Sequence, residues 1–163
     1  MGIYLGLGSN VGERETQMRR VLESLQYRHV TPLRTASLYS TEPRDFEEQP
    51  WFLNTVVEVQ TALEPASLLQ QCLAIEEQAG RIRAIPKGPR VIDIDILLYN
   101  DRELTGTGLK IPHPRFRERR FVLVPLVELA PGMVDPVSGL TMLHLLEACP
   151  DTGVVQRVAN PLL

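Results

Sequence analysis

Residues 91–99 narrow the choice of fold more than any other part of this sequence. They read Val-Ile-Asp-Ile-Asp-Ile-Leu-Leu-Tyr, and such an apolar, β-branched run favours a buried β-strand. Because side chains alternate along a strand, one face is predicted to be apolar and the other to carry both aspartates. The apolar face would hold Ile92, Ile94, Ile96 and Leu98, and the other face Val91, Asp93, Asp95, Leu97 and Tyr99.

The rest of the chain alternates between strand-like and helix-like periodicity. Strands are predicted at 3–8, 30–39, 51–61, 91–99 and 154–158, and helices at 13–27, 66–79, 121–130 and 142–148. Residues 102–120 are predicted to be mostly loop. The order strand, helix, strand, strand, helix, strand predicts an α+β fold, a ferredoxin-like α/β/α sandwich with a mostly antiparallel sheet and appended short helices. At 163 residues, we expect a single domain over 1–163.

Composition indicates an ordinary globular protein. Apolar residues make up 44% and charged residues 23% of the chain, and no apolar run is long enough to span a bilayer. The first residues lack the pattern of a signal peptide, so we expect a soluble, cytoplasmic protein. Cys72 and Cys149 lie in apolar surroundings without metal-ligand spacing, which predicts buried free thiols.

Positive charge is concentrated in one segment of an acidic chain. Residues 81–120 carry ten Lys or Arg and five Asp or Glu, whereas the rest carries seven and fifteen. The net charge of −3 argues against a nucleic-acid or membrane-surface protein. The basic loops on both sides of the 91–99 strand instead predict a local anion site, because arginine binds phosphate bidentately.

The two aspartates predict a site for a hard cation. Asp93 and Asp95 would lie about 7 Å apart on one face of a strand, where two neighbouring anions are unfavourable unless cations neutralise them. Oxygen ligands without a histidine or cysteine cluster suit Mg²⁺, which binds few protein carboxylates together with water and phosphate oxygens. The alternative is an exposed edge strand whose aspartates are simply solvated.

Several stretches occur in an order that resembles one enzyme family. They are Gly8-Ser9-Asn10, Gln49-Pro50-Trp51-Phe52-Leu53-Asn54, Glu76 followed by Gly80-Arg81-Ile82-Arg83, Gly88-Pro89-Arg90-Val91-Ile92-Asp93-Ile94-Asp95, Pro112-His113-Pro114 and Arg119-Arg120-Phe121. From Gly2 to about Pro150 the chain resembles the 6-hydroxymethyl-7,8-dihydropterin pyrophosphokinases of folate biosynthesis. The most specific piece is Gly-Pro-Arg-x-x-Asp-Ile-Asp, which joins an arginine to the carboxylate pair.

The resemblance implies transfer of the β,γ-diphosphate of ATP to the hydroxymethyl oxygen of the pterin, with release of AMP. It implies two Mg²⁺ ions held by Asp93 and Asp95. The expected catalytic residues are these aspartates, Arg81 and Arg90. Pterin-binding positions would be Thr41, Pro43, Phe52, Asn54 and Phe121. Nucleotide-binding positions would be Gln49, Glu76, Arg81, Arg90, Ile96, His113 and Arg119. The expected partners are the two small-molecule substrates, with no nucleic acid, no membrane and a monomeric chain.

The chain departs from the family pattern in two features. Members usually have a tyrosine where this chain has Phe52, which keeps an aromatic face and removes a hydroxyl. They also carry a basic residue and an aromatic residue before Gly-Pro-Arg, where this chain has Pro86 and Lys87 in a loop one residue shorter.

Two other classes of function remain open from the residues alone. Ferredoxin-like sheets also bind RNA by stacking bases on aromatic side chains, although this chain lacks an aromatic-rich RNP1 pattern. Salt-sensitive RNA binding without Mg²⁺ would favour that class. Paired carboxylates also occur in glycoside hydrolases, and activity that persists in a chelator would favour them.

Overall fold

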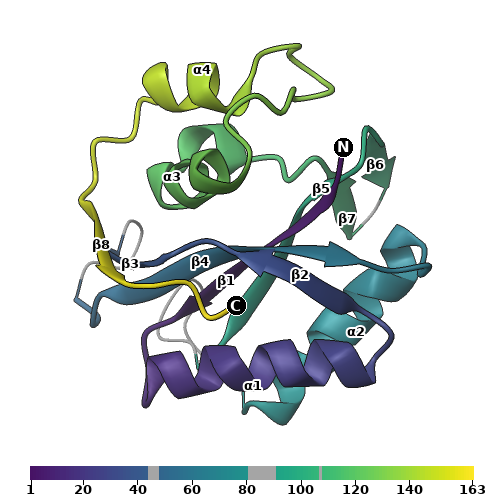
Figure 1. The fold of residues 1–163 in the computed structure, drawn as a ribbon, viewed down its shortest axis with the longest axis vertical. Helices are drawn as coiled ribbons and strands as arrows, with labels where there is room; N and C mark the ends of the chain where they lie inside the picture. The colour runs from purple at the N-terminus through teal and green to yellow at the C-terminus, as the bar shows by residue number, and fades with distance from the viewer. Residues whose placement is uncertain (44–47, 81–90, 107) are drawn as a thin grey trace.

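The computed structural model describes residues 1–43, 48–80, 91–106 and 108–163. Over these residues an antiparallel sheet lies between two helical layers, so the predicted α+β sandwich is confirmed (Figure 1). The strands are β1 (Ile3–Ser9), β2 (Thr31–Thr35), β3 (Leu38–Thr41), β4 (Phe52–Gln60), β5 (Asp93–Tyr99), β6 (Leu104–Gly106), β7 (Leu109–Ile111) and β8 (Val155–Ala159). The helices are α1 (Arg14–Tyr27), α2 (Pro65–Gln78), α3 (Arg120–Leu129) and α4 (Met142–Glu147), with a short 3₁₀ turn η1 (Phe116–Glu118).

The sheet follows the ferredoxin-like order. In the described residues the main sheet has six strands. Five of them pair in the order β5-β1-β4-β3-β8, and the sixth, β2, pairs with the second half of β4. All these pairs are antiparallel. The two strands that α2 connects, β4 and β5, therefore lie on either side of β1. This order places the 91–99 run at a sheet edge, beside the glycine-containing first strand.

Two apolar cores lie on the two faces of the sheet. Helices α1 and α2 cover one face, and α3 and α4 cover the other (Figure 1). The α1 and α2 core includes Leu5, Met18 and Leu68, all fully buried. The α3 and α4 core includes Leu123 and Met142, also fully buried. Side chains from alternate positions of β1 and β4 enter both cores, as the strand periodicity predicts.

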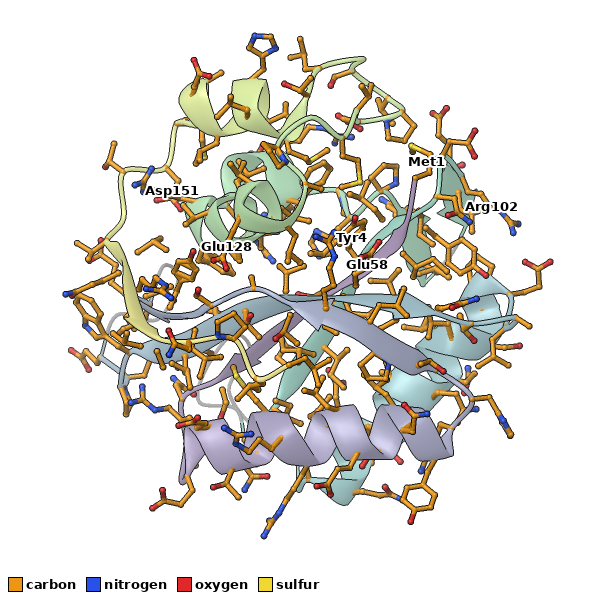
Figure 2. All side chains as sticks on the ribbon, in the orientation of Figure 1. Met1, Tyr4, Glu58, Arg102, Glu128 and Asp151 are labelled. Carbon is orange, nitrogen blue, oxygen red and sulfur yellow. The ribbon has the colours of Figure 1, made fainter. Side chains whose placement is uncertain are left out.

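The predicted strand at 30–39 is wrong as a single element. β2 ends at Thr35 and β3 begins at Leu38, because Ser37 is held by a helix on the other face. The Ser37 N–H and hydroxyl both donate to the Glu128 carboxylate of α3 at 2.9 Å, and the Tyr39 hydroxyl also donates to Glu128. These contacts fix the last turn of α3 to the sheet, and Figure 2 shows Glu128 beneath that helix.

The alternation predicted for the 91–99 run holds only for its first part. Ile92, Ile94 and Ile96 enter the α1 and α2 core as predicted. Leu98, however, enters the opposite core and Tyr99 joins the isoleucines, which reverses both predictions. The β1–β5 pairing shifts register between Tyr4 and Leu5, so an extra residue of β5 moves the following side chains to the other face.

The expected loop at 102–120 contains more structure than predicted. The hairpin β6–β7 and the turn η1 lie within it.

No helix in the described part of the chain is long and apolar enough to span a bilayer. Both cysteines are free as expected. Cys72 is buried as predicted, whereas the predicted burial of Cys149 is wrong, since this residue is only half-buried. Burial, together with nearby carboxylates, raises the pKa of Cys72 to about 12, so this thiol stays protonated at neutral pH.

Candidate active site

A cavity of about 440 Å³ lies between the sheet and the start of α3. Its walls come from β1, β4, β5, the end of β3 with the segment after it, the start of α3 with the segment before it, and Asp151. Ten of the residues expected at the site line it, namely Thr41, Pro43, Gln49, Phe52, Asn54, Asp93, Asp95, His113, Arg119 and Phe121. These residues span the sequence from 41 to 121, so the fold gathers them from five separate segments.

Of the other four expected residues, only two are described by the structure, and these two do not line this cavity. Arg81 and Arg90 lie outside the described residues, as does the loop with Pro86 and Lys87. Glu76 and Ile96 are buried, with 1% and 5% of their surface exposed. Ile96 lines a second cavity of about 320 Å³, whose lining includes Asp95 and His113 from the first.

Glu76 supports the strand that carries the aspartates. Its carboxylate on α2 accepts the backbone N–H of Ile94 at 2.8 Å. Ile94 lies between Asp93 and Asp95 on a strand at the sheet edge, where an outward N–H needs a partner from outside the sheet. Glu76 therefore fixes the backbone between the two carboxylates.

Asp93 and Asp95 both face the cavity and are half-buried. Their neighbours across the β1–β5 pairing are Gly8 and Gly6, which have no side chains to fill the space beside the carboxylates. Within the described part of the chain no group of three or more His, Cys, Asp or Glu is arranged to hold a metal. Two carboxylates are nevertheless an ordinary protein contribution to a Mg²⁺ site, since water and phosphate oxygens complete it.

His113 carries no charge at neutral pH. Burial, helped by the positive charges of Arg119 and Arg115, lowers its pKa to about 4 even though Asp93 acts in the opposite direction. Its Nδ1 accepts the Arg115 N–H at 3.1 Å. The proton of the neutral ring is therefore assigned to Nε2, which makes His113 a hydrogen-bond donor at the cavity wall.

Aromatic and amide groups form the other end of the cavity. Phe52 and Phe121 are half-buried, whereas Asn54 has only 7% of its surface exposed. The Asn54 side-chain N–H donates to the Thr41 hydroxyl at 2.5 Å, which fixes the orientation of the amide. The Arg119 guanidinium lies 5.7 Å from the centre of the Phe121 ring. Flat aromatic faces beside a fixed amide suit a planar heterocycle with hydrogen-bonding edges.

Gly8 leaves the space that Asn54 occupies. A Cβ built on Gly8 would lie 2.7 Å from Oδ1 of Asn54, which is too close for both to stay in place. A Cβ on Gly6, two residues earlier on the same strand, would meet Leu97 at an ordinary 3.5 Å. The position of the Asn54 amide therefore requires a glycine at residue 8 but not at residue 6.

The turn after β1 holds Gln49 at the cavity. The Asn10 side-chain N–H donates to the Gln49 side-chain oxygen at 2.8 Å and to the Pro50 carbonyl at 3.0 Å. This contact gives the Gly-Ser-Asn turn a structural role that its sequence alone did not reveal.

Several charged cavity residues were not among the expected site residues. They are Glu42, Arg115, Glu118 and Asp151. Arg115 belongs to the basic segment that predicted an anion site, but the acidic residues had no local signal. Conversely, Arg117 from the same segment pairs with Asp135, with Nε to Oδ2 at 2.5 Å. The basic segment is thus divided between the cavity and an internal ion pair.

Comparison with known proteins gives consistent matches. Residues 4–131 match the family model of 7,8-dihydro-6-hydroxymethylpterin-pyrophosphokinase (HPPK). A 2-amino-4-hydroxy-6-hydroxymethyldihydropteridine pyrophosphokinase from Methylorubrum extorquens is 41% identical over 93% of this chain and 95% of its own length. The corresponding protein from Bacillus subtilis is 45% identical over 77% of this chain and 76% of its own.

Other relatives are much longer than this chain. The folic acid synthesis protein fol1 of Pneumocystis carinii is 40% identical over 93% of this chain, which spans about a fifth (20%) of that protein. A crystal structure of Plasmodium falciparum HPPK-DHPS has a TM-score of 0.72 and 18% identity, over 90% of this chain and 45% of that one. The structural match supports the same fold.

Proposed function

The chain belongs to the 7,8-dihydro-6-hydroxymethylpterin-pyrophosphokinase family, and from this we propose that it transfers the β,γ-diphosphate of ATP to the hydroxymethyl oxygen of 6-hydroxymethyl-7,8-dihydropterin, releasing AMP. The observation that carries the proposal is that one cavity joins two aromatic faces and a fixed amide to a pair of carboxylates. The first group suits a pterin, and the second suits a metal-bound phosphate chain.

At the pterin end, Phe52 and Phe121 would stack on the ring, and Asn54 would form hydrogen bonds with its edge. Thr41 holds the Asn54 amide at 2.5 Å, so the amide is oriented before the substrate arrives. Pro43 would complete this wall of the cavity. Together these groups would place the hydroxymethyl oxygen toward the aspartates, and a fixed reacting geometry accounts for much of the rate of such a transfer.

At the phosphate end, Asp93 and Asp95 would hold Mg²⁺, which when bound neutralises phosphate oxygens and aligns the attacking and leaving groups. The donor set fits this ion because both ligands are carboxylates beside glycine backbone. Arg119 would neutralise further phosphate charge. Neutral His113 would donate a hydrogen bond from Nε2 to a phosphate oxygen. We also propose that the nucleotide is contacted by Gln49, Ile96, Arg81 and Arg90. Glu76 would support the nucleotide site indirectly, by fixing the backbone of β5.

We further propose that residues 1–163 act as one domain. Cavity residues run from Gly6 to Asp151, and β8 completes the sheet on the side of β3. The expected monomeric state and cytoplasmic location stay predictions.

Calorimetry tests the proposal directly. 6-Hydroxymethyl-7,8-dihydropterin and a non-hydrolysable ATP analogue are titrated into the protein with Mg²⁺ or with excess chelator. We expect the nucleotide to bind with Mg²⁺ and to lose most of its affinity in chelator, because two carboxylates would otherwise repel the phosphates. With ATP itself, AMP and the pterin diphosphate should form in equal amounts. Mg²⁺-independent binding of RNA, or turnover that persists in chelator, would contradict the proposal.

Gly8→Ala is expected to weaken pterin binding at least about tenfold, because the new methyl group displaces Asn54 and breaks its hydrogen bond to Thr41. Gly6→Ala is the matched control, since it adds the same methyl group to the same strand beside the same cavity. Pterin dissociation constants of both variants are compared by calorimetry. Equal dissociation constants for the two variants would rule out this role of Gly8.

A further inference from the structure

The segment at residues 151–154 lies outside the part of the chain that matches the family model, yet it reaches the cavity. That match ends at residue 131, whereas Asp151 is among the lining residues. Figure 2 shows Asp151 on the connection between α4 and β8, beside α3. Part of the cavity wall therefore comes from sequence that the family pattern does not describe.

Asp151 caps the helix that carries the aromatic wall. Its Oδ2 accepts the N–H of Arg120, the first residue of α3, at 3.0 Å, and its Oδ1 accepts the Gly153 N–H at 2.8 Å. Among the described residues, the side chain that caps the start of α3 is Asp151 and not the N-cap residue Arg119. A carboxylate at this position satisfies a helix N–H and interacts favourably with the helix dipole.

The same segment also holds the opposite wall of the cavity. The Val154 N–H donates to the Glu42 carboxylate at 2.7 Å, and the Glu42 N–H donates to the Val154 carbonyl at 3.3 Å. Thr41 pairs with Val155 at the start of β8. Glu42 lies between Thr41 and Pro43, which both line the cavity. Residues 151–154 thus connect the wall after β3 to the start of α3.

The far end of α3 is fixed separately. Glu128 accepts hydrogen bonds from Ser37 and Tyr39 on the sheet. With that end anchored, the contact between Asp151 and Arg120 holds the first turn of α3 at the cavity, in addition to the packing of α3 on its neighbours. Arg119 and Phe121 are the immediate neighbours of Arg120 and both line the cavity.

We propose that Asp151 is a positioning residue that sets Phe121 and Arg119 for the pterin and the phosphate chain by capping α3. The inference rests on the function proposed above. Asp151 need not touch either substrate, because its effect passes through the backbone of Arg120.

The test compares Asp151→Ala and Asp151→Asn with Thr141→Ala. Thr141 caps α4, where its hydroxyl accepts the His144 N–H at 3.2 Å, and it does not line the cavity. Thr141→Ala therefore also removes a side-chain acceptor from the first turn of a helix, but at a distance from the site. Melting temperatures, AMP formation and pterin dissociation constants are measured for all variants and the parent.

Loss of the cap in Asp151→Ala is expected to raise the pterin KM and dissociation constant about fivefold to tenfold. Asp151→Asn, which retains an acceptor oxygen, should recover most of this loss. Thr141→Ala should lower the melting temperature similarly and leave the pterin KM within about twofold of the parent.

Two results would overturn the inference while the parent still makes AMP. One is a pterin KM in Asp151→Ala that equals that of Thr141→Ala. The other is an equal loss in Asp151→Asn and Asp151→Ala, which would indicate that the charge itself acts on the substrates. A parent that neither binds pterin nor forms AMP would instead reject the proposed function.

Discussion

Asp95→Ala should lower the rate of AMP formation by a factor of about 10³ or more, because it removes one of two carboxylates proposed to hold Mg²⁺ against the phosphate chain. The fold should remain intact. Asp95 is half-buried beside Gly6 at the cavity wall, and it does not belong to either apolar core. The measurement is the rate of AMP formation at saturating substrates, together with the circular dichroism spectrum and melting temperature.

Asp101→Ala is the matched control for this variant. Asp101 is exposed in the turn that follows the same strand, and it does not line either cavity. The same change of charge there should leave the rate within about twofold of the parent, because an exposed charge is screened by solvent. If Asp95→Ala formed AMP within tenfold of the parent rate, Asp95 would not be a metal ligand.

Arg117→Met should lower the free energy of unfolding by about 3 kcal/mol, because it leaves the buried carboxylate of Asp135 without its cation. Arg117 binds Asp135 through two contacts, Nε to Oδ2 at 2.5 Å and Nη2 to Oδ1 at 2.8 Å. The Asp135 side chain is fully buried, and the Arg117 guanidinium also lies 4.6 Å from the centre of the Phe116 ring. Methionine keeps an apolar chain at that position, and urea denaturation measures the change.

Arg19→Met provides the comparison. Arg19 pairs with Glu15 at 3.1 Å on the surface of α1, where both side chains are more than half exposed, so the loss should stay below about 0.5 kcal/mol. Adding Asp135→Asn to Arg117→Met should restore part of the lost stability, because a neutral amide is less costly to bury than a carboxylate. Equal losses in Arg117→Met and Arg19→Met would show that the buried pair does not stabilise the fold.

The same pair predicts a dependence of stability on pH. Burial alone would raise the pKa of Asp135, but hydrogen bonds from Arg117, Ser138 and the Val137 N–H outweigh it and lower the pKa from 3.8 to about 2. A carboxyl group whose pKa is lower in the folded than in the unfolded state stabilises the folded protein at pH values above the unfolded-state pKa. This contribution should therefore be lost as the pH falls from about 4 toward 2, and Arg117→Met should lose less stability over that range.

The helices and most strands could be predicted because their signals are local. The 3.6-residue spacing of Met18, Val21, Leu22 and Leu25 in α1, and Pro65 at the start of α2, indicated elements that the structure confirms within a few residues. The break between β2 and β3 could not be predicted. It depends on Glu128, which lies 91 residues away from Ser37.

For the candidate site, the sequence predicted which residue types gather but not how they are supported. Asp93, Asp95, Phe52 and Asn54 were expected at one site, and the structure places them around one cavity. Their functional roles stay predictions. The support from Glu76 to the backbone of Ile94 could not be predicted, because a hydrogen bond between a helix side chain and a strand leaves no periodic pattern.

The sequence by itself determined the class of fold, the carboxylate pair on one strand and the family to which these motifs belong, since all three depend on spacing along the chain. Tertiary structure alone decided which arginine side chains of the basic segment line the cavity and which one forms an internal ion pair. It also decided that Asp151 caps α3 and that a register shift moves Leu98 and Tyr99 to opposite cores. These features depend on contacts between distant segments, which form only when the sheet and both helical layers pack together.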